Sequence, residues 1–213
     1  MSLRAYGIIM HDNGHRPLPS VPAGAQVLPL RELAAVTEDG DYTARDIEPA
    51  DIERHLDVVS SVFKQDAILP MPVGTVFRSQ EVLQRWMELH YVALSDALAW
   101  VEDRVGARVH ISRTHGGHNG GGTGGGDREA GSDLAAVAGE ITKELRRHAV
   151  ASVALRTENI TGLMLSGAFL IERPLWNEFA EAVHREAAPH HSVRVSLTGP
   201  WPPYDFVRMQ FGT

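Results

Sequence analysis

A glycine-rich run, GGHNGGGTGGG at residues 116–126, is the part of the chain that most resembles a ligand-binding motif. Gly120, Gly122 and Gly125 have the G-x-G-x-x-G spacing with which backbone N–H groups can cradle a phosphate. Such a cradle needs a short turn leading straight into a helix, whereas residues 127–129 (Asp-Arg-Glu) come first and add acidic charge. The run therefore favours a surface insertion. The alternative is an enzyme or sensor that binds a nucleotide or a flavin with this loop.

The eleven histidines could bind a metal ion, but their spacing does not favour it. His115 and His118 share the glycine-rich loop, and His190 and His191 are adjacent. No carboxylate or thiolate accompanies them at a recognised ligand spacing. The chain also lacks a G-x-S-x-G nucleophile motif, and its paired carboxylates lie in polar stretches. We therefore expect no enzymatic activity, no catalytic residue, no metal site and no cofactor.

Composition narrows the remaining classes of function. The chain has 213 residues and a formal net charge of -7, with no basic block that could release counterions from phosphates, so we expect no nucleic-acid partner. No run approaches the roughly 20 apolar residues that a membrane span needs. The absence of cysteine excludes disulfides and thiolate metal sites, and it fits a cytoplasmic protein.

The first half of the chain predicts a small α+β domain over residues 1–78. A short strand opens it at residues 5–10, and a helix follows at 49–64 with Ile52, Leu56, Val59 and Phe63 on one face. Ser79 can cap a long helix to about residue 103, which would connect this domain to the next over residues 79–104. Two apolar rows run along that helix. The first row is Val82, Trp86, Leu89, Ala93, Ala97 and Trp100, and the second is Leu83, Met87, Leu94, Leu98 and Val101.

The second half, residues 105–213, reads as β-α-β-β-α-β between residues 107 and 198. Alternating or continuous apolar runs give the strands, and the two helices begin near Ser132 or Asp133 and at Pro174. This order is typical of a ferredoxin-like domain, an antiparallel sheet with both helices on one face. The predicted fold class is therefore α+β with two domains. The second domain carries the glycine-rich loop 116–126 and a C-terminal strap at 199–213.

Two proline-rich segments combine stiffness with large apolar side chains. Residues 68–77 contain Pro70 and Pro72, and residues 199–206 contain three prolines together with Trp201, Tyr204 and Phe206. Proline fixes φ and removes a backbone donor, so neither segment can continue a helix or form a central strand. Two alternatives remain for each segment. It packs on its own domain as an edge strand or strap, or it forms a docking surface whose rigid side chains lose little entropy on binding.

The same two segments resemble a known family. LPMPVGTVF at residues 69–77 is similar to the LPxxFGTVF stretch of gas-vesicle accessory proteins of the GvpL/GvpF family, although Pro72 and Val73 stand where the family usually has Arg-Phe. LTGPWPPYDFV at residues 197–207 matches that family's terminal LTGPWPPYxFV signature nearly residue for residue. The strand at Tyr6 and the strand before Pro174 occur in the same order as in the family, so the resemblance covers both halves.

The resemblance implies a non-enzymatic protein in the cytoplasm, associated with gas vesicles, which are hollow shells of a small and very apolar protein. It implies that the chain binds this shell protein and other accessory proteins, either as an assembly factor or as a scaffolding component of the vesicle. The candidate partner-binding residues are those of the two motifs: Leu69, Pro70, Gly74, Thr75, Phe77, Gly199, Pro200, Trp201, Pro202, Pro203, Tyr204 and Phe206.

Overall fold

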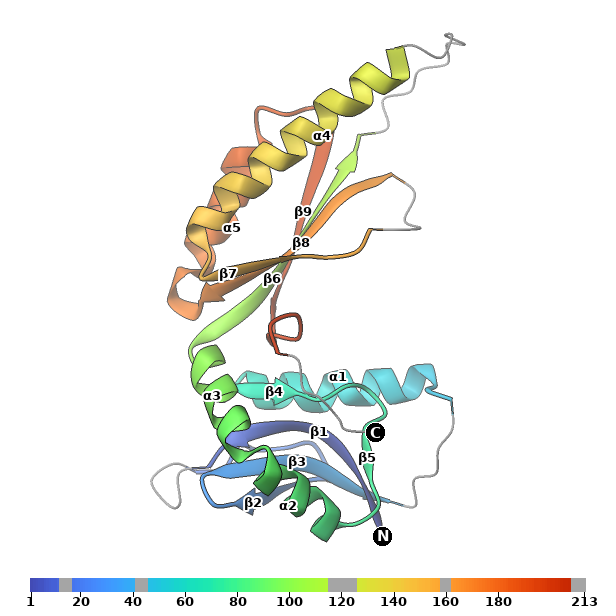
Figure 1. Ribbon diagram of the computed structural model, residues 1–213, viewed down its shortest axis with the longest axis vertical. Coiled ribbons are helices and arrows are strands. Elements are labelled where there is room, and N and C mark those ends of the chain that lie inside the picture. Colours follow the sequence, from blue (N-terminus) through green and yellow to red (C-terminus); the bar gives the residue numbers. More distant parts are fainter. Residues whose placement is uncertain (12–16, 41–45, 115–125, 158–161, 208–213) are drawn as a thin grey trace. The chain divides into compact units, whose positions relative to one another are not determined.

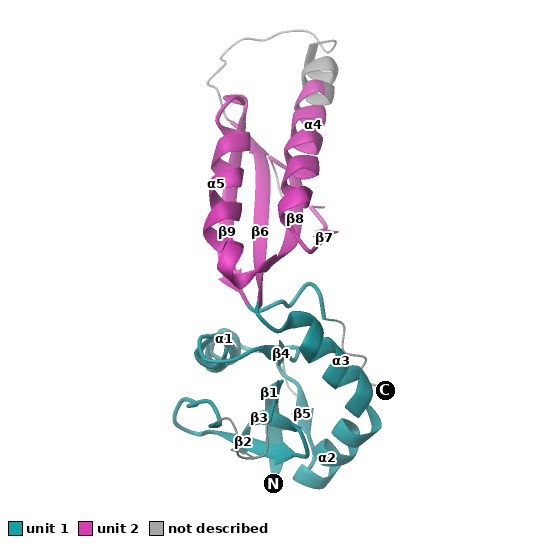
Figure 2. Ribbon diagram, turned by 90° about the vertical axis from the view of Figure 1, so that its left-hand side faces the viewer, with its two compact units in different colours: residues 1–103, 202–213 teal, residues 104–201 magenta. Residues whose placement is uncertain are grey.

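The computed structural model describes residues 1–11, 17–40, 46–114, 126–157 and 162–207. It divides the chain into two compact units, shown in teal and magenta in Figure 2. The first unit contains Met1–Asp103 and Pro202–Thr213, and the second contains Arg104–Trp201. This division differs from the expected one. Residues 79–103 belong to the first unit, and so does the tail after Trp201, because Val207 packs against the first unit's apolar core.

The first unit is built on one antiparallel sheet with the strand order β2-β3-β1-β4, and β5 also pairs with β1. β2 is an edge strand and includes Pro29, whose missing N–H costs no hydrogen bond there. The elements are β1 (Ser2–Met10), β2 (Ala25–Leu30), β3 (Leu33–Gly40), α1 (Pro49–Phe63), β4 (Ile68–Pro70), β5 (Val76–Phe77), α2 (Gln80–Leu89) and α3 (Tyr91–Val101).

Helices cover both sides of this sheet. Figure 2 shows α1 on one side and α2 and α3 on the other. Strand β1 contributes side chains to both sides of the sheet, because successive side chains of a strand point to opposite faces. Leu3, Ala5 and Ile8 join the apolar cluster that α2 and α3 complete. Arg4 and Tyr6 contact residues of α1.

The expected single helix over residues 79–104 is wrong, because it is interrupted at His90. The backbone of His90 leaves the helical region (φ -107°, ψ 11°), and this residue ends α2 and begins α3. Its Nδ1 lies 2.8 Å from the Trp86 carbonyl oxygen, and its ring stacks on the Trp86 ring with 4.9 Å between centroids. These local contacts fix the position of the break.

The two apolar rows of this region differ in how far they are buried. The second row, Leu83, Met87, Leu94, Leu98 and Val101, is buried against the sheet. From the first row, Val82 and Leu89 are exposed. Trp86 and Ala97 of the first row are partly buried against the same cluster, so this row is buried only in part.

The second unit has a four-stranded antiparallel sheet with the order β7-β8-β6-β9. Figure 1 shows α4 and α5 on the same side of that sheet. Its elements are β6 (Arg104–Arg113), α4 (Gly126–Leu145), β7 (Ala151–Ala154), β8 (Leu163–Glu172), α5 (Trp176–Ala187) and β9 (Val193–Trp201), with 3₁₀ turns at Arg146–His148 and Arg173–Leu175. Helix α4 begins at Gly126, six residues before the expected start at Ser132.

Candidate functional site

The first motif, residues 69–77, lines one edge of β1. The Met71 N–H donates to the Tyr6 carbonyl oxygen and the Ala5 N–H donates to the Thr75 carbonyl oxygen, both at 2.9 Å. Leu69, Pro70, Met71 and Phe77 are buried, and the Phe77 ring lies 5.7 Å from the Trp86 ring. Most of the large side chains of this motif therefore stabilise the fold.

The turn of the first motif is its exposed part. Gly74 has φ +81°, which disfavours any residue with a side chain, and Thr75 donates from both its N–H and its Oγ1 to the Pro72 carbonyl oxygen. Gly74, Pro72 and Val76 face solvent. The departure from the family pattern at Pro72 thus falls on the surface.

The second motif begins at the end of β9. Gly199 has φ +132°, and a Cβ there would lie 2.8 Å from both the Gly106 carbonyl oxygen and the Trp176 ring, so only glycine fits. The Gly199–Pro200 peptide bond is cis. The Trp201 indole N–H donates to Thr198 Oγ1 at 3.2 Å, and 43% of Trp201 remains exposed. β9 is an edge strand, which is where proline is tolerated.

After Trp201 the second motif enters the first unit. Pro202 and Pro203 are buried, and Tyr204 and Phe206 are half-buried. Val207 packs against the cluster that contains Phe77, so the structure brings the ends of the two motifs to one core. The second motif is divided between the units, since Gly199, Pro200 and Trp201 belong to the second and the residues from Pro202 onward to the first.

A charged cluster that was not predicted from the sequence lies on the α1 side of the first sheet. The Tyr6 hydroxyl donates to Glu38, and Arg54 donates to both Glu38 carboxylate oxygens at 3.1 and 3.3 Å. Beside this network, Arg4 pairs with Asp51 at 2.8 Å. Strands β1 and β3 and helix α1 therefore contribute five titratable side chains to one mostly buried region.

Burial and hydrogen bonding perturb this cluster. Burial raises the pKa of Tyr6, and its hydrogen bond to Glu38 adds to the shift. Burial opposes ionisation of Glu38, but the hydrogen bonds from Tyr6 and Arg54 outweigh it and lower the pKa of that carboxyl. The Glu38 hydrogen bond also raises the pKa of Arg54. All three groups thus keep their ordinary charges at neutral pH.

His55 lies next to this cluster, 1% exposed, with its ring 5.6 Å from the Tyr6 ring. Burial, assisted by the positive charge of Arg4, lowers the pKa of His55 to about 4. Within the described part of the chain, neither of its ring nitrogens has a hydrogen-bond partner. Neutral His55 therefore serves here as a packing residue.

Helical spacing could have revealed the cluster. Asp51, Arg54 and His55 stand at positions i, i+3 and i+4 and share one helix face. The expected inward face was instead the apolar one, and this was wrong for two of its members, since Ile52 is 44% exposed and Leu56 is 45% exposed. The helix turns its charged side chains toward the sheet because Arg4 and Glu38 are there to pair with them.

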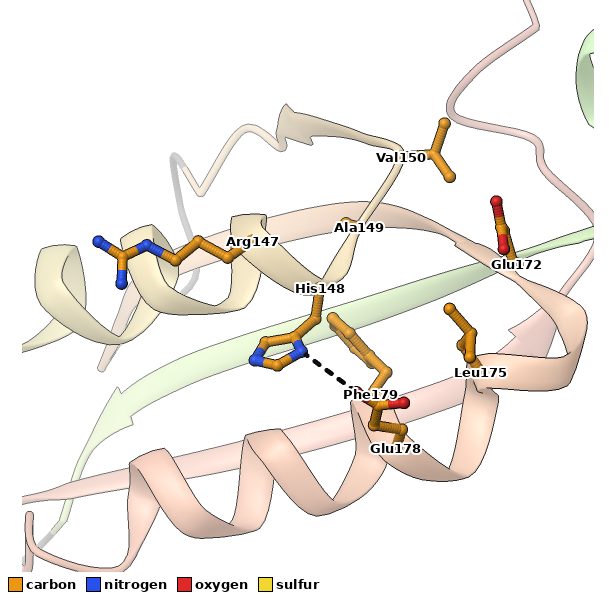
Figure 3. Close-up of a pocket in the computed structure, with 8 residues that line it drawn as sticks. All are labelled: Arg147, His148, Ala149, Val150, Glu172, Leu175, Glu178 and Phe179. Atoms are coloured by element: carbon orange, nitrogen blue, oxygen red, sulfur yellow. Dashed lines mark ion pairs between the residues drawn. The ribbon is translucent and has the colours of Figure 1, made fainter.

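A pocket of about 240 Å³ lies in the second unit, between the 3₁₀ turns and α5 (Figure 3). Phe179 and Leu175 supply apolar walls, and His148 Nδ1 lies 4.0 Å from Glu178 Oε1. The Arg147 guanidinium donates to Glu144, which is not one of the lining residues. The residues that line the pocket are Arg147, His148, Ala149, Val150, Glu172, Leu175, Glu178 and Phe179.

The described residues contain no group of three or more histidine, cysteine, aspartate or glutamate side chains placed to hold a metal ion. No helix among them is long and apolar enough to cross a membrane. Residues 116–125 of the glycine-rich run lie outside the described residues, so nucleotide binding by that loop stays an untested alternative.

Comparison with known proteins gives a consistent result. The family model described as "Gas vesicle synthesis protein GvpL/GvpF" matches residues 4–117 and 127–208. Gas vesicle protein F2 of Halobacterium salinarum is 28% identical over 194 residues, covering 88% of this chain and 82% of that protein. Gas vesicle protein F1 of the same organism is 26% identical over 220 residues, covering 99% and 95%.

Solved structures show the same fold at low sequence identity. The crystal structure of the gas vesicle protein GvpF from Anabaena aligns with a TM-score of 0.82 at 13% identity, covering 99% of both chains. GvpF from Microcystis aeruginosa aligns with a TM-score of 0.74 at 12% identity, covering 98% of this chain and 99% of the other. The mixed arrangement of two antiparallel sheets and five α-helices in the described residues is therefore shared with these proteins.

Proposed function

Because the chain belongs to the GvpL/GvpF family of gas vesicle synthesis proteins, we propose that it is a non-enzymatic accessory protein of gas vesicle assembly. It acts by binding other proteins, namely the apolar shell protein and further accessory proteins, in the cytoplasm and at the vesicle. The observation that carries this proposal is the family match, which spans both units and includes both motifs.

The physical need for such a protein supports the proposal. A shell subunit with a water-repelling face exposes apolar surface before assembly, and exposed apolar surface leads to aggregation. A partner with a net charge of -7 that covers this surface keeps the complex dispersed. Binding and release of a polypeptide suffice for this role, and no bond is made or broken.

We also propose that the second unit is a ferredoxin-like domain. Its order β6-α4-β7-β8-α5-β9, the sheet order β7-β8-β6-β9 and the position of both helices on one side of the sheet fit a ferredoxin-like domain (Figure 1). The fold does not itself define a function. It supplies the edge strand β9 that ends in Trp201.

Within the two motifs we propose a division of roles. The buried residues Leu69, Pro70 and Phe77 of the first motif, and Pro202 and Pro203 of the second, hold the fold. Trp201 is the motif's large exposed aromatic side chain and contributes directly to docking. Gly74 and Thr75 shape the exposed turn, Gly199 and Pro200 set the direction of the chain before Trp201, and Tyr204 and Phe206 anchor the tail behind it.

Co-expression of the shell protein with a tagged form of this chain tests the proposal. The wild-type chain is expected to retain the shell protein, and Trp201→Ala is expected to retain less of it at an equal amount of folded protein. Leu175→Ala is the matched control, because Leu175 is a similarly exposed apolar side chain of the same unit at 42%. Failure of the wild-type chain to retain the shell protein contradicts the proposed function. Retention that Trp201→Ala leaves unchanged contradicts the role of Trp201.

A further inference from the structure

The outward side of α2 and α3 carries apolar side chains that nothing in the described structure covers. We call Val82, Leu89 and Val92 the outer row; their exposed fractions are 47%, 76% and 70%. Apart from Met1, no large apolar side chain of the described residues is more exposed than Leu89 and Val92. These two residues lie on either side of the break at His90, three positions apart. Large aliphatic side chains this exposed are costly in water and are typical of interaction surfaces.

Along α2, α3 and the two residues after them the charges are mostly negative, although the Arg31 guanidinium carbon lies 5.6 Å from the Tyr91 ring centroid at the start of α3. Between residues 80 and 103 the acidic side chains number five and the only arginine is Arg85. All five acidic residues are exposed: Glu81, Glu88, Asp96, Glu102 and Asp103. Glu88 directly precedes Leu89 and Asp96 lies four positions after Val92, while the exposed Arg85 lies between Val82 and Leu89 on the same helix face. The surface therefore combines an apolar centre with an acidic rim.

We infer that the outer row and its acidic rim bind a basic amphipathic helix of a partner polypeptide. This inference rests on the proposed function and names the chemistry of the partner. Two helices pack by interlocking side chains, so a helical surface is suited to a second helix, whereas an added strand needs a free sheet edge. Apolar residues of the partner cover Leu89 and Val92, and its lysine or arginine residues approach the acidic rim.

Charge complementarity disfavours two other occupants. A second copy of this chain bound through the same face would bring one acidic rim against another, and like charges in contact oppose association. An anionic lipid surface would be repelled for the same reason. Binding of a basic partner should also weaken as salt is added, because salt screens the attraction between exposed charges.

Two synthetic peptides test the inference on the full chain. Both are amphipathic helices of equal length with the same leucine and alanine face; one carries lysine and arginine along its flanks and the other carries glutamate. Fluorescence anisotropy should show that the basic peptide binds at least about tenfold more tightly than the acidic one, a difference of about 1.4 kcal/mol. It should also show that this preference shrinks as salt is added. Equal affinity for both peptides would overturn the inference.

Two variants locate the binding surface. Leu89→Ser with Val92→Ser should weaken binding of the basic peptide about tenfold or more, since it removes the apolar centre. Glu88→Lys with Asp96→Lys should weaken the basic peptide and strengthen the acidic one. The matched control is Ile52→Ser with Leu56→Ser on α1, where both side chains are 44–45% exposed but belong to another helix. The control should bind like the wild type, and an equal loss in the control would overturn the inference.

The shell-protein experiment separates this inference from the proposed function. If the wild-type chain retains the shell protein or a co-expressed accessory protein, and Leu89→Ser with Val92→Ser retains as much, the inference fails while the proposed function stands. If the wild-type chain retains no gas vesicle protein, the proposed function fails, whatever the peptides show.

Discussion

The two sides of the first unit's sheet are both covered by helices, yet they use different chemistry. The side under α2 and α3 is an apolar cluster that includes Leu33, Leu69, Leu83 and Leu98. The side under α1 includes Arg4, Tyr6, Glu38, Arg54 and His55, besides buried valines of α1. Apolar packing gives stability that hardly depends on pH, whereas buried titratable groups link stability to proton binding. One sheet should therefore show both behaviours, and each can be disturbed separately.

Removing apolar volume under α3 should have the largest effect. Leu98 is fully buried, and Leu98→Ala leaves a cavity in the apolar cluster. We expect the free energy of unfolding to fall by about 2–5 kcal/mol, with little change in its pH dependence. Urea unfolding at pH 7 and pH 5 measures both quantities. A loss below about 1 kcal/mol would contradict the close packing of Leu98 in the apolar cluster.

The pH dependence should come from the α1 side. The pKa of His55 is lowered to about 4 in the folded chain, compared with an ordinary value of 6.5. The unfolded chain therefore binds more protons between these two values, and the folded state loses stability as the pH falls from 6.5 toward 4. We expect a loss of about 2 kcal/mol between pH 7 and pH 5. Glu38, whose pKa is lowered, adds to the loss only at still lower pH.

His55→Leu is the variant that isolates this contribution. It replaces the imidazole by an apolar side chain of similar bulk and so removes the titrating group. The free energy of unfolding of this variant should therefore change much less between pH 7 and pH 5 than that of the wild type. A variant with the same pH dependence as the wild type would show that another group is responsible.

The hydrogen bond between Tyr6 and Glu38 should have a smaller effect. Tyr6→Phe removes the hydroxyl but leaves Glu38 paired with Arg54. We expect the free energy of unfolding to fall by about 1 kcal/mol, the net value of a typical hydrogen bond. Thermal or urea unfolding at pH 7 measures it, and an unchanged stability would mean that water replaces the hydroxyl without cost.

Substitutions on the exposed side of α2 and α3 should have the smallest effect on stability. Leu89→Ser with Val92→Ser changes side chains that are 76% and 70% exposed, so stability should stay within about 0.5 kcal/mol of the wild type. A large loss would mean that the outer row already packs against this chain, and the contrast with Leu98 would disappear.

Much of the fold could be predicted from local pattern. The order of strands and helices over residues 104–201 follows from periodicity and from proline and glycine positions, and Pro29 and the prolines near residue 200 predict edge strands. The break at His90 could not be predicted, because apolar residues continue on both sides of it. Likewise the tail after Trp201 gives no local sign that it belongs to the first unit.

The candidate site was less predictable, for a physical reason. The charged residues of α1 that face inward pair with Arg4 and Glu38, which are far away in the sequence. The motif residues were found by resemblance, and the structure shows that several of them are buried. Val82 and Leu89 of the outer row belong to the first of the two predicted apolar rows and Val92 to neither, and only the structure shows that these three side chains are exposed.

Gas vesicle formation in living cells shows whether the chain acts in vesicle assembly through its outer row. In cells that lack this chain, the wild-type chain and the Leu89→Ser, Val92→Ser variant are supplied at equal levels of folded protein, and the yield of floating vesicles is measured. We expect the wild type to restore the vesicles and the variant, although folded, to restore far fewer. Equal yields from the two chains would show that the outer row plays no part in assembly.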